Sequence, residues 1–584
     1  MIRQTFLWVF LFCVSAVLSF SGCEDEEKPN TLTVNPSTVI FKGEGGTSSL
    51  TIRTNASSWS IENPVSDWLS ISATSGSDNE ATITLTVASR SQNQRTGTLV
   101  VKAGNAKPIE VSISQAASQF LYGLSAGASS LDFPIDGGTS SLSIQTDAPD
   151  WKVTADVEWV NFSQSEGTTG NATIDVTAAE NTSDERRSGK ITLTSETPGA
   201  PVVTIDVTQD GPLYPNYNTS PLPPDLSGMS SNAMELAAKI KLGWNLGNSL
   251  EATGGETAWG NPQVSKALID KVKESGFNAI RIPASWNQHM ANAGKAELKT
   301  EWLNRVEEVV QYCVENDMYV ILNIHWDGGW LENNITPEKQ EENNAKQKAF
   351  WEQIATHFRD YDEHLLFASA NEPNVENATQ MAVLTSYHQT FIDAVRATGG
   401  RNTYRNLIIQ GPSTDIEKTK NLMLTLPVDP TENRMMAEVH YYTPWNFCGL
   451  EADADWGKMF YYWGEGYHSE TDPERNATWG EEETVDANFQ LMKTQFVDKG
   501  IPVVLGEYGV TRRSTLVGDA LTKHLASRAY YLKYVTKQAL AYGLLPFYWD
   551  NGGTGNFGSG IFNRTNNTVF DQQALDALLE GATE

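Results

Sequence analysis

The second part of this chain, from about residue 230 onward, alternates between short apolar runs and longer segments with helical periodicity. Helix-like segments include Val264–Ser275, Glu301–Glu315, Glu341–Arg359 and Met381–Thr398. The apolar runs are predicted to be eight strands: Leu242–Leu246, Ala279–Ile282, Tyr319–His325, Leu365–Asn371, Leu407–Gln410, Ala437–Tyr441, Val503–Glu507 and Leu545–Trp549. Strands that alternate with helices form parallel α/β sheets, and eight such units predict a (β/α)8 barrel with long loop insertions over residues 230–584.

A doubly wound open sheet is the alternative architecture for the same alternation. That fold usually carries a glycine-rich phosphate loop after its first strand. The segment GWNLGNS at Gly243–Ser249 lacks the spacing of a dinucleotide-binding loop. The pattern therefore favours the closed barrel.

Polar and aromatic side chains lie at the ends of most predicted strands. Barrel enzymes build their active sites from the carboxyl ends of their strands, so these residues are expected to meet at one face. They are Asn248, Arg281, His325, Asn371, Glu372, His440, Tyr442, Glu507 and Trp549. A single such residue would carry little information, whereas a set spread over successive strands predicts an active site.

The first part of the chain contains an internal repeat. GGTSSL occurs at Gly45–Leu50 and again at Gly137–Leu142. Each copy has strictly alternating apolar stretches separated by Gly, Ser and Asn, which is typical of β-sandwiches. We predict two immunoglobulin-like sandwiches, at residues 31–117 and 121–211. Trp59, Trp68, Trp151 and Trp159 recur at matched positions, which favours core packing over sugar binding.

Residues 212–229 are rich in proline, which is typical of a semi-rigid linker. The chain contains 42 Lys and Arg against 72 Asp and Glu, a formal charge of −30. A field of that sign repels phosphate backbones, so nucleic acid is not expected as a partner. Cys313 lies in a predicted amphipathic helix and is expected to be a buried free thiol. One disulfide between Cys313 and Cys448 is also arithmetically possible.

The amino terminus predicts an exported, lipid-anchored protein. Arg3 is followed by a short apolar run, and residues 1–22 are interpreted as a signal peptide. FSGC, which ends at Cys23, resembles a bacterial lipobox, although Phe20 stands where leucine is usual. The acidic residues Glu24–Glu27 resemble the tag of surface lipoproteins in some Gram-negative gut bacteria. These likenesses imply lipid attachment at Cys23 and a location on the outer face of the cell outer membrane.

Two strand-end glutamates suggest a glycosidase. Hydrolysis of a glycosidic bond requires one carboxyl group that protonates the leaving oxygen and a second that faces the anomeric carbon. Glu372 lies in NEP after the predicted fourth strand, and Glu507 lies in GEYG after the seventh. A metal-dependent hydrolase that uses His325, His440, Glu372 and Glu507 is a second possibility, although the tight HxH spacing common in barrel metal sites is missing from the sequence.

The motifs RIP, NIH, NEP, HYY, GEYG and FYWDNG, in this order, resemble glycoside hydrolase family 5. GWNLGNSLEATG resembles subfamily 4, which contains endo-β-1,4-glucanases and xyloglucanases. The amino-terminal repeats are similar to BACON domains, and we expect them to act as a spacer.

The family resemblance assigns roles to the strand-end residues. It implies a retaining mechanism in which Glu372 is the acid/base and Glu507 is the nucleophile. Glu507 should then raise the pKa of Glu372. The resemblance implies no metal and no cofactor. It also implies that eight further residues bind the substrate or support the two glutamates: Arg281, His325, Asn371, His440, Tyr442, Trp549, Asn248 and Trp259.

Several functions remain open from sequence alone. Xyloglucan is the favoured substrate, with mixed-linkage β-glucan, cellulose-type glucan and mannan as alternatives. A surface glycan-binding protein without activity is a further alternative, although the set of site residues is intact. The long segment after the sixth strand, residues 444–483, is rich in aromatic rings, and we expect half or more of the following to pack within it: Trp445, Phe447, Trp456, Phe460, Tyr461, Tyr462, Trp463 and Trp479. We expect the protein to be a monomer.

Overall fold

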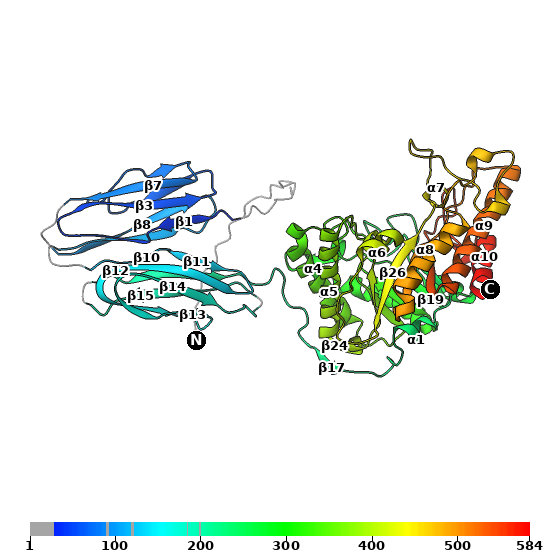
Figure 1. Ribbon diagram of the computed structural model, residues 1–584, viewed down its shortest axis with the longest axis horizontal. Coiled ribbons are helices and arrows are strands. Elements are labelled where there is room, and N and C mark those ends of the chain that lie inside the picture. Colours follow the sequence, from blue (N-terminus) through cyan, green and yellow to red (C-terminus); the bar gives the residue numbers. More distant parts are fainter. Residues whose placement is uncertain (1–28, 89–92, 118–121, 184, 198–199) are drawn as a thin grey trace, which may run out of the picture. The chain divides into compact units, whose positions relative to one another are not determined.

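The computed structural model describes residues 29–88, 93–117, 122–183, 185–197 and 200–584 (Figure 1). The chain divides into two compact units, Met1–Gly211 and Pro212–Glu584. The predicted signal peptide and Cys23 lie outside the described residues. Among the residues described, no helix combines the length and apolarity that a membrane crossing requires.

Two β-sandwiches make up the first unit. In the first sandwich the strand orders of the two sheets are β1-β3-β7-β5 and β2-β9-β8-β4-β6. Its strands are β1 Leu32–Asn35, β2 Thr38–Phe41, β3 Gly46–Thr54, β4 Trp59–Glu62, β5 Ser70–Ile71, β6 Ser75–Gly76, β7 Glu80–Val87, β8 Arg95–Ala103 and β9 Ile109–Gln115. The alternating burial along β7 follows from alternating apolar and polar residues, because successive side chains of a strand face opposite sides.

The second sandwich repeats this plan with longer strands. Its strands are β10 Leu124–Ala126, β11 Ser130–Phe133, β12 Gly138–Ala155, β13 Val160–Phe162, β14 Glu166–Ala178, β15 Arg187–Thr194 and β16 Val203–Gln209. β12 pairs with β14 along most of its length, with an irregularity between Thr146 and Asp150, and then with β15. This break lets one strand take part in both halves of the sandwich.

The matched tryptophans pack in the cores, as predicted. Trp59 and Trp151 are 4% and 1% exposed. Each indole lies over a glycine of its own copy, Gly76 or Gly167, where an added Cβ would approach the ring to 2.5 or 2.4 Å. The other pair, Trp68 and Trp159, is half-buried against the cores. An arginine covers each of these two rings, Arg95 at 4.4 Å and Arg187 at 4.6 Å from the ring centroid.

Eight parallel strands close into a barrel in the second unit, which confirms the predicted fold. The order is β18-β19-β22-β23-β25-β26-β27-β28, and β18 pairs with β28 to close the ring. The strands are β18 Gly243–Leu246, β19 Ala279–Ile282, β22 Tyr319–Asn323, β23 Leu365–Ala368, β25 Leu407–Gln410, β26 Met435–Tyr441, β27 Val503–Tyr508 and β28 Leu544–Asp550. Each overlaps the run predicted for it.

Helices surround the barrel (Figure 1). They are α1 Ala233–Ala237, α2 Lys266–Glu274, α3 Thr300–Glu315, α4 Pro337–His357, α5 Ala378–Ala397, α6 Ile416–Leu422, α7 Trp445–Cys448, α8 Glu482–Gln495, α9 Gly518–Ala541 and α10 Gln572–Thr583. Local chemistry starts several of them. Ser265 and Asn377 cap α2 and α5 by accepting hydrogen bonds from backbone amides, and proline begins α4.

The segment predicted as a linker lies along the barrel unit. Its strand β17 (Leu222–Pro224) pairs in parallel with β24 (Gly399–Gly400). The backbone amide of Tyr217 donates to Glu352 over 2.8 Å. The other small strands of this unit are β20 Met290–Asn292, β21 Glu297–Leu298, β29 Phe562–Asn563 and β30 Thr568–Val569. Cys313 is a buried free thiol, as predicted, and Cys448 is also buried and free.

Candidate active site

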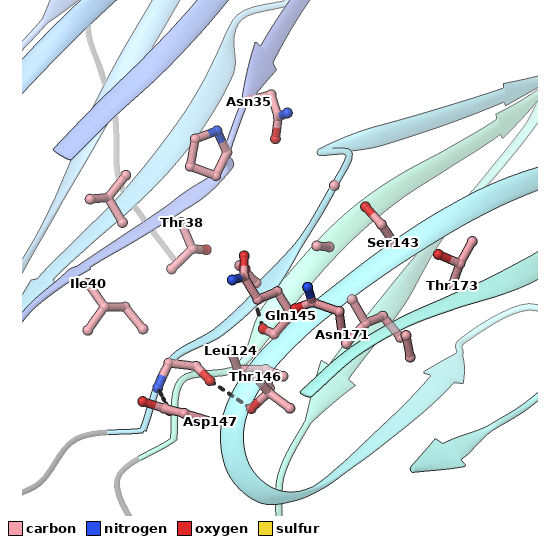
Figure 2. Close-up of a pocket in the computed structure, with 18 of the residues that line it drawn as sticks. Asn35, Thr38, Ile40, Leu124, Ser143, Gln145, Thr146, Asp147, Asn171 and Thr173 are labelled. Atoms are coloured by element: carbon pink, nitrogen blue, oxygen red, sulfur yellow. Dashed lines mark hydrogen bonds between the residues drawn. The ribbon is translucent and has the colours of Figure 1, made fainter. Parts of the chain in front are cut away.

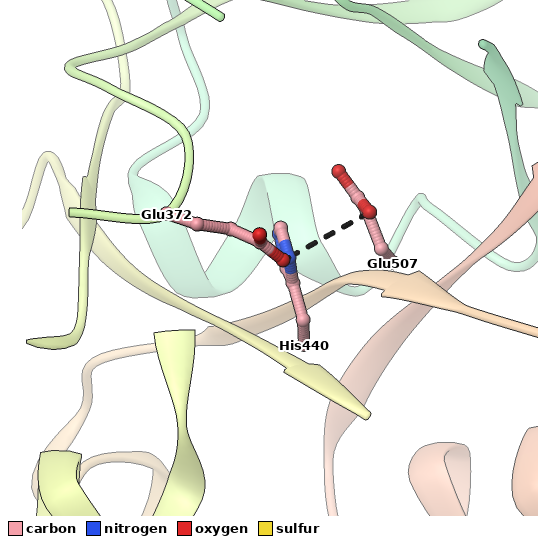
Figure 3. Close-up of side chains that lie close together, drawn as sticks. All are labelled: Glu372, His440 and Glu507. Atoms are coloured by element: carbon pink, nitrogen blue, oxygen red, sulfur yellow. Dashed lines mark hydrogen bonds and ion pairs between the residues drawn. The ribbon is translucent and has the colours of Figure 1, made fainter. Parts of the chain in front are cut away.

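Two glutamates meet at the carboxyl ends of the barrel strands. Glu507 lies on β27, and Glu372 follows β23. His440 on β26 lies between them, and Figure 3 shows its ring beside both carboxyl groups. One carboxylate oxygen of Glu372 and one of Glu507 lie within 4.8 Å of each other. Retaining glycosidases separate their carboxyl groups by about 5–5.5 Å, and inverting ones by about 6.5–9.5 Å. The spacing therefore fits a retaining reaction.

Glu507 is held by two donors. Arg281 Nη1 lies 2.9 Å from Oε1 of Glu507, and the Tyr442 hydroxyl donates to Oε2 over 3.0 Å. The side chain of Arg281 is fully buried and that of Glu507 is 7% exposed. Both contacts favour the ionised carboxylate and fix the direction of its oxygens. The resulting group is a buried anion with a fixed orientation, which suits a nucleophile.

Glu372 has a different environment. Its Oε1 lies 2.7 Å from Nδ1 of His440, and its side chain is 47% exposed. Glu507 is 3.7 Å from the same ring nitrogen. Glu372 is therefore the more accessible carboxyl group, and one proton at the 2.7 Å contact can be held by either partner.

The pKa values of this cluster reflect burial and mutual contact. Burial raises the pKa of Glu507, although His440 and Arg281 oppose the shift. Burial, the largest single cause, would raise the pKa of Glu372 as well, but the hydrogen bond and charge of His440 together with the charge of Arg281 outweigh it, and the pKa falls. For His440, burial is outweighed by Glu507, Glu372 and Glu438, and its pKa rises to about 9. The expected rise in the pKa of Glu372 is therefore absent in the free protein, because His440 and Arg281 favour its ionised form.

The remaining predicted residues fall into two groups. Asn371 accepts a hydrogen bond from Arg281 Nη2 over 2.7 Å, so it belongs to the same network. His325 stacks with Trp549 at a centroid distance of 6.0 Å, which places both rings together at the strand ends. Burial lowers the pKa of His325 well below its usual value, so this ring is neutral. A neutral imidazole and a half-buried indole form a surface suited to a sugar ring.

Asn248 and Trp259 lie on the loop after β18. Asn248 has a positive φ of 57°, and its carbonyl accepts from Asn261 over 2.8 Å. Trp259 is 46% exposed. In the described part of the chain, no hydrogen bond joins either residue to the two glutamates. Asn248 shapes the loop, and Trp259 offers a ring to solvent.

Family profiles match both units of the chain. The profile described as "Cellulase (glycosyl hydrolase family 5)" matches residues 245–555, which is more than half of the sequence. The chain belongs to glycosyl hydrolase family 5. Enzymes of this family are retaining, in agreement with the spacing of Glu372 and Glu507. A profile described as "Putative binding domain, N-terminal", the BACON domain, matches residues 57–116 and 150–210.

Characterised family 5 members are similar over long stretches. The xyloglucan-specific endo-beta-1,4-glucanase of Bacteroides ovatus is 34% identical over 464 residues, which cover 76% of this chain and 89% of that protein. Endoglucanase A of Paenibacillus barcinonensis is 38% identical over 376 residues, covering 60% of this chain and 90% of the relative. The solved Bacteroides ovatus xyloglucanase in complex with a XXXG heptasaccharide has a TM-score of 0.59 at 32% identity, covering 78% of this chain and 98% of that one.

The insertion after β26 divides its rings between core and surface. Phe447, Phe460, Tyr462 and Trp463 are buried, and Tyr461 is half-buried, so the expectation that half or more would pack is confirmed. Trp445, Trp456 and Trp479 are 47%, 64% and 50% exposed. Trp445 packs edge-on against Tyr442 with centroids 6.1 Å apart, which places one exposed ring beside the catalytic centre of this family 5 enzyme.

Three buried polar residues of the centre escaped the sequence analysis. Glu438 on β26 and Gln410 on β25 are both fully buried, and Asn245 on β18 accepts from Arg281 Nη1 over 3.0 Å. A signal existed, because each is a polar residue in a mostly apolar strand, and the strands of a parallel barrel are expected to be apolar. The search for polar residues just past the strand ends therefore did not find these three buried residues beneath the two catalytic carboxyl groups.

Glu372, His440 and Glu507 also have the spacing of a metal site, since their ligand atoms lie within 4.8 Å of one another. Their contacts favour proton chemistry instead. Both oxygens of Glu507 face donors, Arg281 and Tyr442, and Nδ1 of His440 faces Glu372. A metal ion would have to displace those partners and lie beside the Arg281 guanidinium, an unfavourable neighbour for a cation.

Proposed function

We propose that this family 5 enzyme cleaves internal β-1,4 bonds of xyloglucan by double displacement, with Glu507 as nucleophile and Glu372 as acid/base. The pair of carboxyl groups within 4.8 Å, one anchored and buried and one half-exposed, carries the proposal. Two similar solved structures, from Bacteroides ovatus and from a ruminal metagenomic library, are described as xyloglucanases.

In the first step Glu507 attacks the anomeric carbon and forms a glycosyl ester. The bond to the leaving sugar oxygen breaks, and Glu372 gives that oxygen its proton. In the second step Glu372, now a carboxylate, takes a proton from water. The hydroxide oxygen bonds to the anomeric carbon and releases Glu507. Two inversions give net retention of configuration.

Substrate binding shifts the proton that Glu372 and His440 share toward Glu372. Glu372 and His440 share one proton across 2.7 Å, as a carboxylate with an imidazolium or as a neutral pair. A glucan chain that covers the exposed half of Glu372 removes water from the charged form. Because desolvation penalises an ion pair more than a neutral pair, the proton moves toward Glu372. The substrate thus converts Glu372 into the acid it needs.

We expect the highest kcat/KM on xyloglucan when the enzyme is assayed on a panel of xyloglucan, mixed-linkage β-glucan, soluble cellulose derivatives, xylan and mannan. Reducing ends are counted, and product lengths are determined by mass spectrometry. Oligosaccharides should dominate from the earliest time point, because cleavage at internal bonds releases chain fragments rather than single sugars. A higher kcat/KM on mannan or mixed-linkage glucan would contradict the xyloglucan assignment. Single glucose units as the main early product would contradict internal cleavage.

We further propose that a lipid on Cys23 anchors the protein to the outer membrane, with the two sandwiches as a spacer. The lipobox-like FSGC and the acidic run at Glu24–Glu27 support the anchor, and burial of the matched tryptophans supports the spacer. In a bacterial host, Cys23→Ser should abolish incorporation of labelled fatty acid and shift the protein from the membrane to the soluble fraction. A Cys23→Ser protein that stays in the membrane fraction would contradict the anchor.

A further inference from the structure

Glu438 is a fully buried carboxylate directly beneath the catalytic pair. It lies on β26, two residues before His440, so both side chains point to the same side of the strand. Its backbone carbonyl accepts from the amide of Gly411, and Gln410 Nε2 donates to its Oε2 over 2.6 Å. A side chain with so many fixed partners has little freedom to move.

The other carboxylate oxygen of Glu438 meets two groups of the centre. Oε1 lies 3.0 Å from Nε of Arg281, an ion pair within the barrel, and 3.2 Å from Nε2 of His440. Both groups therefore touch Glu438 on one side and a catalytic glutamate on the other. Arg281 turns its Nη1 to Glu507, and His440 turns its Nδ1 to Glu372.

Gly506 shows how tightly Glu438 is enclosed. A Cβ added at Gly506 would come within 2.0 Å of Oε1 of Glu438. The glycine of the GEYG motif is therefore required by the carboxylate beside it. Asn245 donates to the Gly506 carbonyl over 2.8 Å, which fixes the backbone immediately before Glu507.

We propose that Glu438 is a positioning residue of the catalytic centre, a buried anion that holds Arg281 toward Glu507 and His440 Nδ1 toward Glu372. This inference rests on the proposed roles of the two glutamates. With Nε2–H directed at Glu438, a neutral His440 presents its lone pair at Nδ1 to the Glu372 proton. Glu438 therefore selects the tautomer in which Glu372 can be an acid.

Charge balance in the cluster gives Glu438 a second effect. The charged and titratable groups that face this centre come from β19, β23, β26 and β27, with His325 after β22. They are Arg281, Glu372, Glu438, His440, Tyr442, Glu507 and His325, and the buried Glu332 also interacts with Glu372. The negative charge of Glu438 disfavours ionisation of Glu372 and favours the imidazolium of His440. Glu438 therefore keeps the shared proton in the cluster to higher pH.

Glu438→Gln tests this role because it removes the charge and preserves the shape. The pKa of the Glu372–His440 pair should fall, so the basic limb of the pH profile of kcat/KM should move about one pH unit lower. We expect kcat to fall roughly 10- to 100-fold, as when an orienting partner is removed, with KM within about twofold. Glu438→Asp keeps the charge but withdraws it from its partners, so its basic limb should stay near that of the wild type while kcat falls.

Glu363→Gln is the matched control, because Glu363 is a buried carboxylate before β23 that pairs with Lys239 at 2.6 Å, away from this cluster. Its basic limb should not move. If the basic limb of the pH profile of Glu438→Gln stays at its wild-type position, the inference is overturned. If Glu438→Gln does not fold, a wild-type kcat in Glu438→Asp overturns it instead. If Glu372→Ala loses activity but the pH profile of Glu438→Gln is the same as that of the wild type, only the role of Glu438 is refuted. Wild-type activity in Glu372→Ala would instead refute the proposed function.

Discussion

Glu507→Ala should reduce hydrolysis of xyloglucan by at least about 10⁴-fold, because the variant has no group that can form the glycosyl ester. Binding of the polysaccharide should persist, since the sugar-facing rings and Glu372 remain. The loss should appear in kcat, measured by release of reducing ends, while the dissociation constant from calorimetry should change little. Folding should also be preserved, because Arg281 keeps Glu438 as a partner at 3.0 Å after Glu507 is removed.

Azide provides a sharper readout of the nucleophile. In Glu507→Ala a small anion can enter the vacated space and attack the anomeric carbon directly while Glu372 protonates the leaving group. One inversion from a β-glycoside gives an α-glycosyl azide, which NMR identifies by its anomeric coupling. A β-glycosyl azide from this variant, or substantial hydrolysis without azide, would refute the nucleophile assignment. A chelator added to the wild-type enzyme serves as a control, and loss of activity there would favour the metal-dependent alternative.

The barrel fold could be predicted from the sequence because the same pattern occurs eight times along the chain. Each barrel strand is a short apolar run between helical segments, and all eight predicted runs overlap observed strands. The strand ends were readable as well, because closure of the barrel brings them to one face, where Arg281, Asn371, Tyr442 and His440 gather around the two glutamates. The repeated pattern in the sequence was therefore sufficient to predict the barrel and most of the residues around the two glutamates.

The buried polar residues beneath the two carboxyl groups could not be predicted from the sequence in the same way. Glu438 lies within β26 and Gln410 ends β25, and only the three-dimensional barrel shows that Glu438 meets both Arg281 and Gln410. The location of the shared proton depends on distances of tenths of an ångström between His440 and its neighbours, which spacing along the chain does not encode. Trp259 stays a prediction, because its ring is 46% exposed and a stacking role depends on the position of the bound glucan chain.

Glu372→Ala should slow hydrolysis of xyloglucan by roughly 10²- to 10⁴-fold, the usual contribution of a positioned general acid. An oligosaccharide with a dinitrophenolate leaving group should still react with Glu507, because that leaving group departs without a proton. The ester should then accumulate, since no base activates water for the second step. A burst of dinitrophenolate followed by a slow steady state, together with the mass of a glycosyl-enzyme, would establish this sequence of events.

Azide should act differently on Glu372→Ala than on Glu507→Ala, and the contrast assigns the two roles. In Glu372→Ala the anion attacks the glycosyl ester of Glu507, so two inversions give a β-glycosyl azide, the opposite anomer. The anion needs no general base, and it is admitted because the alanine leaves the half-exposed position of Glu372 open and uncharged. Turnover of the dinitrophenyl substrate should therefore recover with azide. An α-azide, or no burst, would mean that Glu372 is not the acid/base and that the two glutamates must exchange roles.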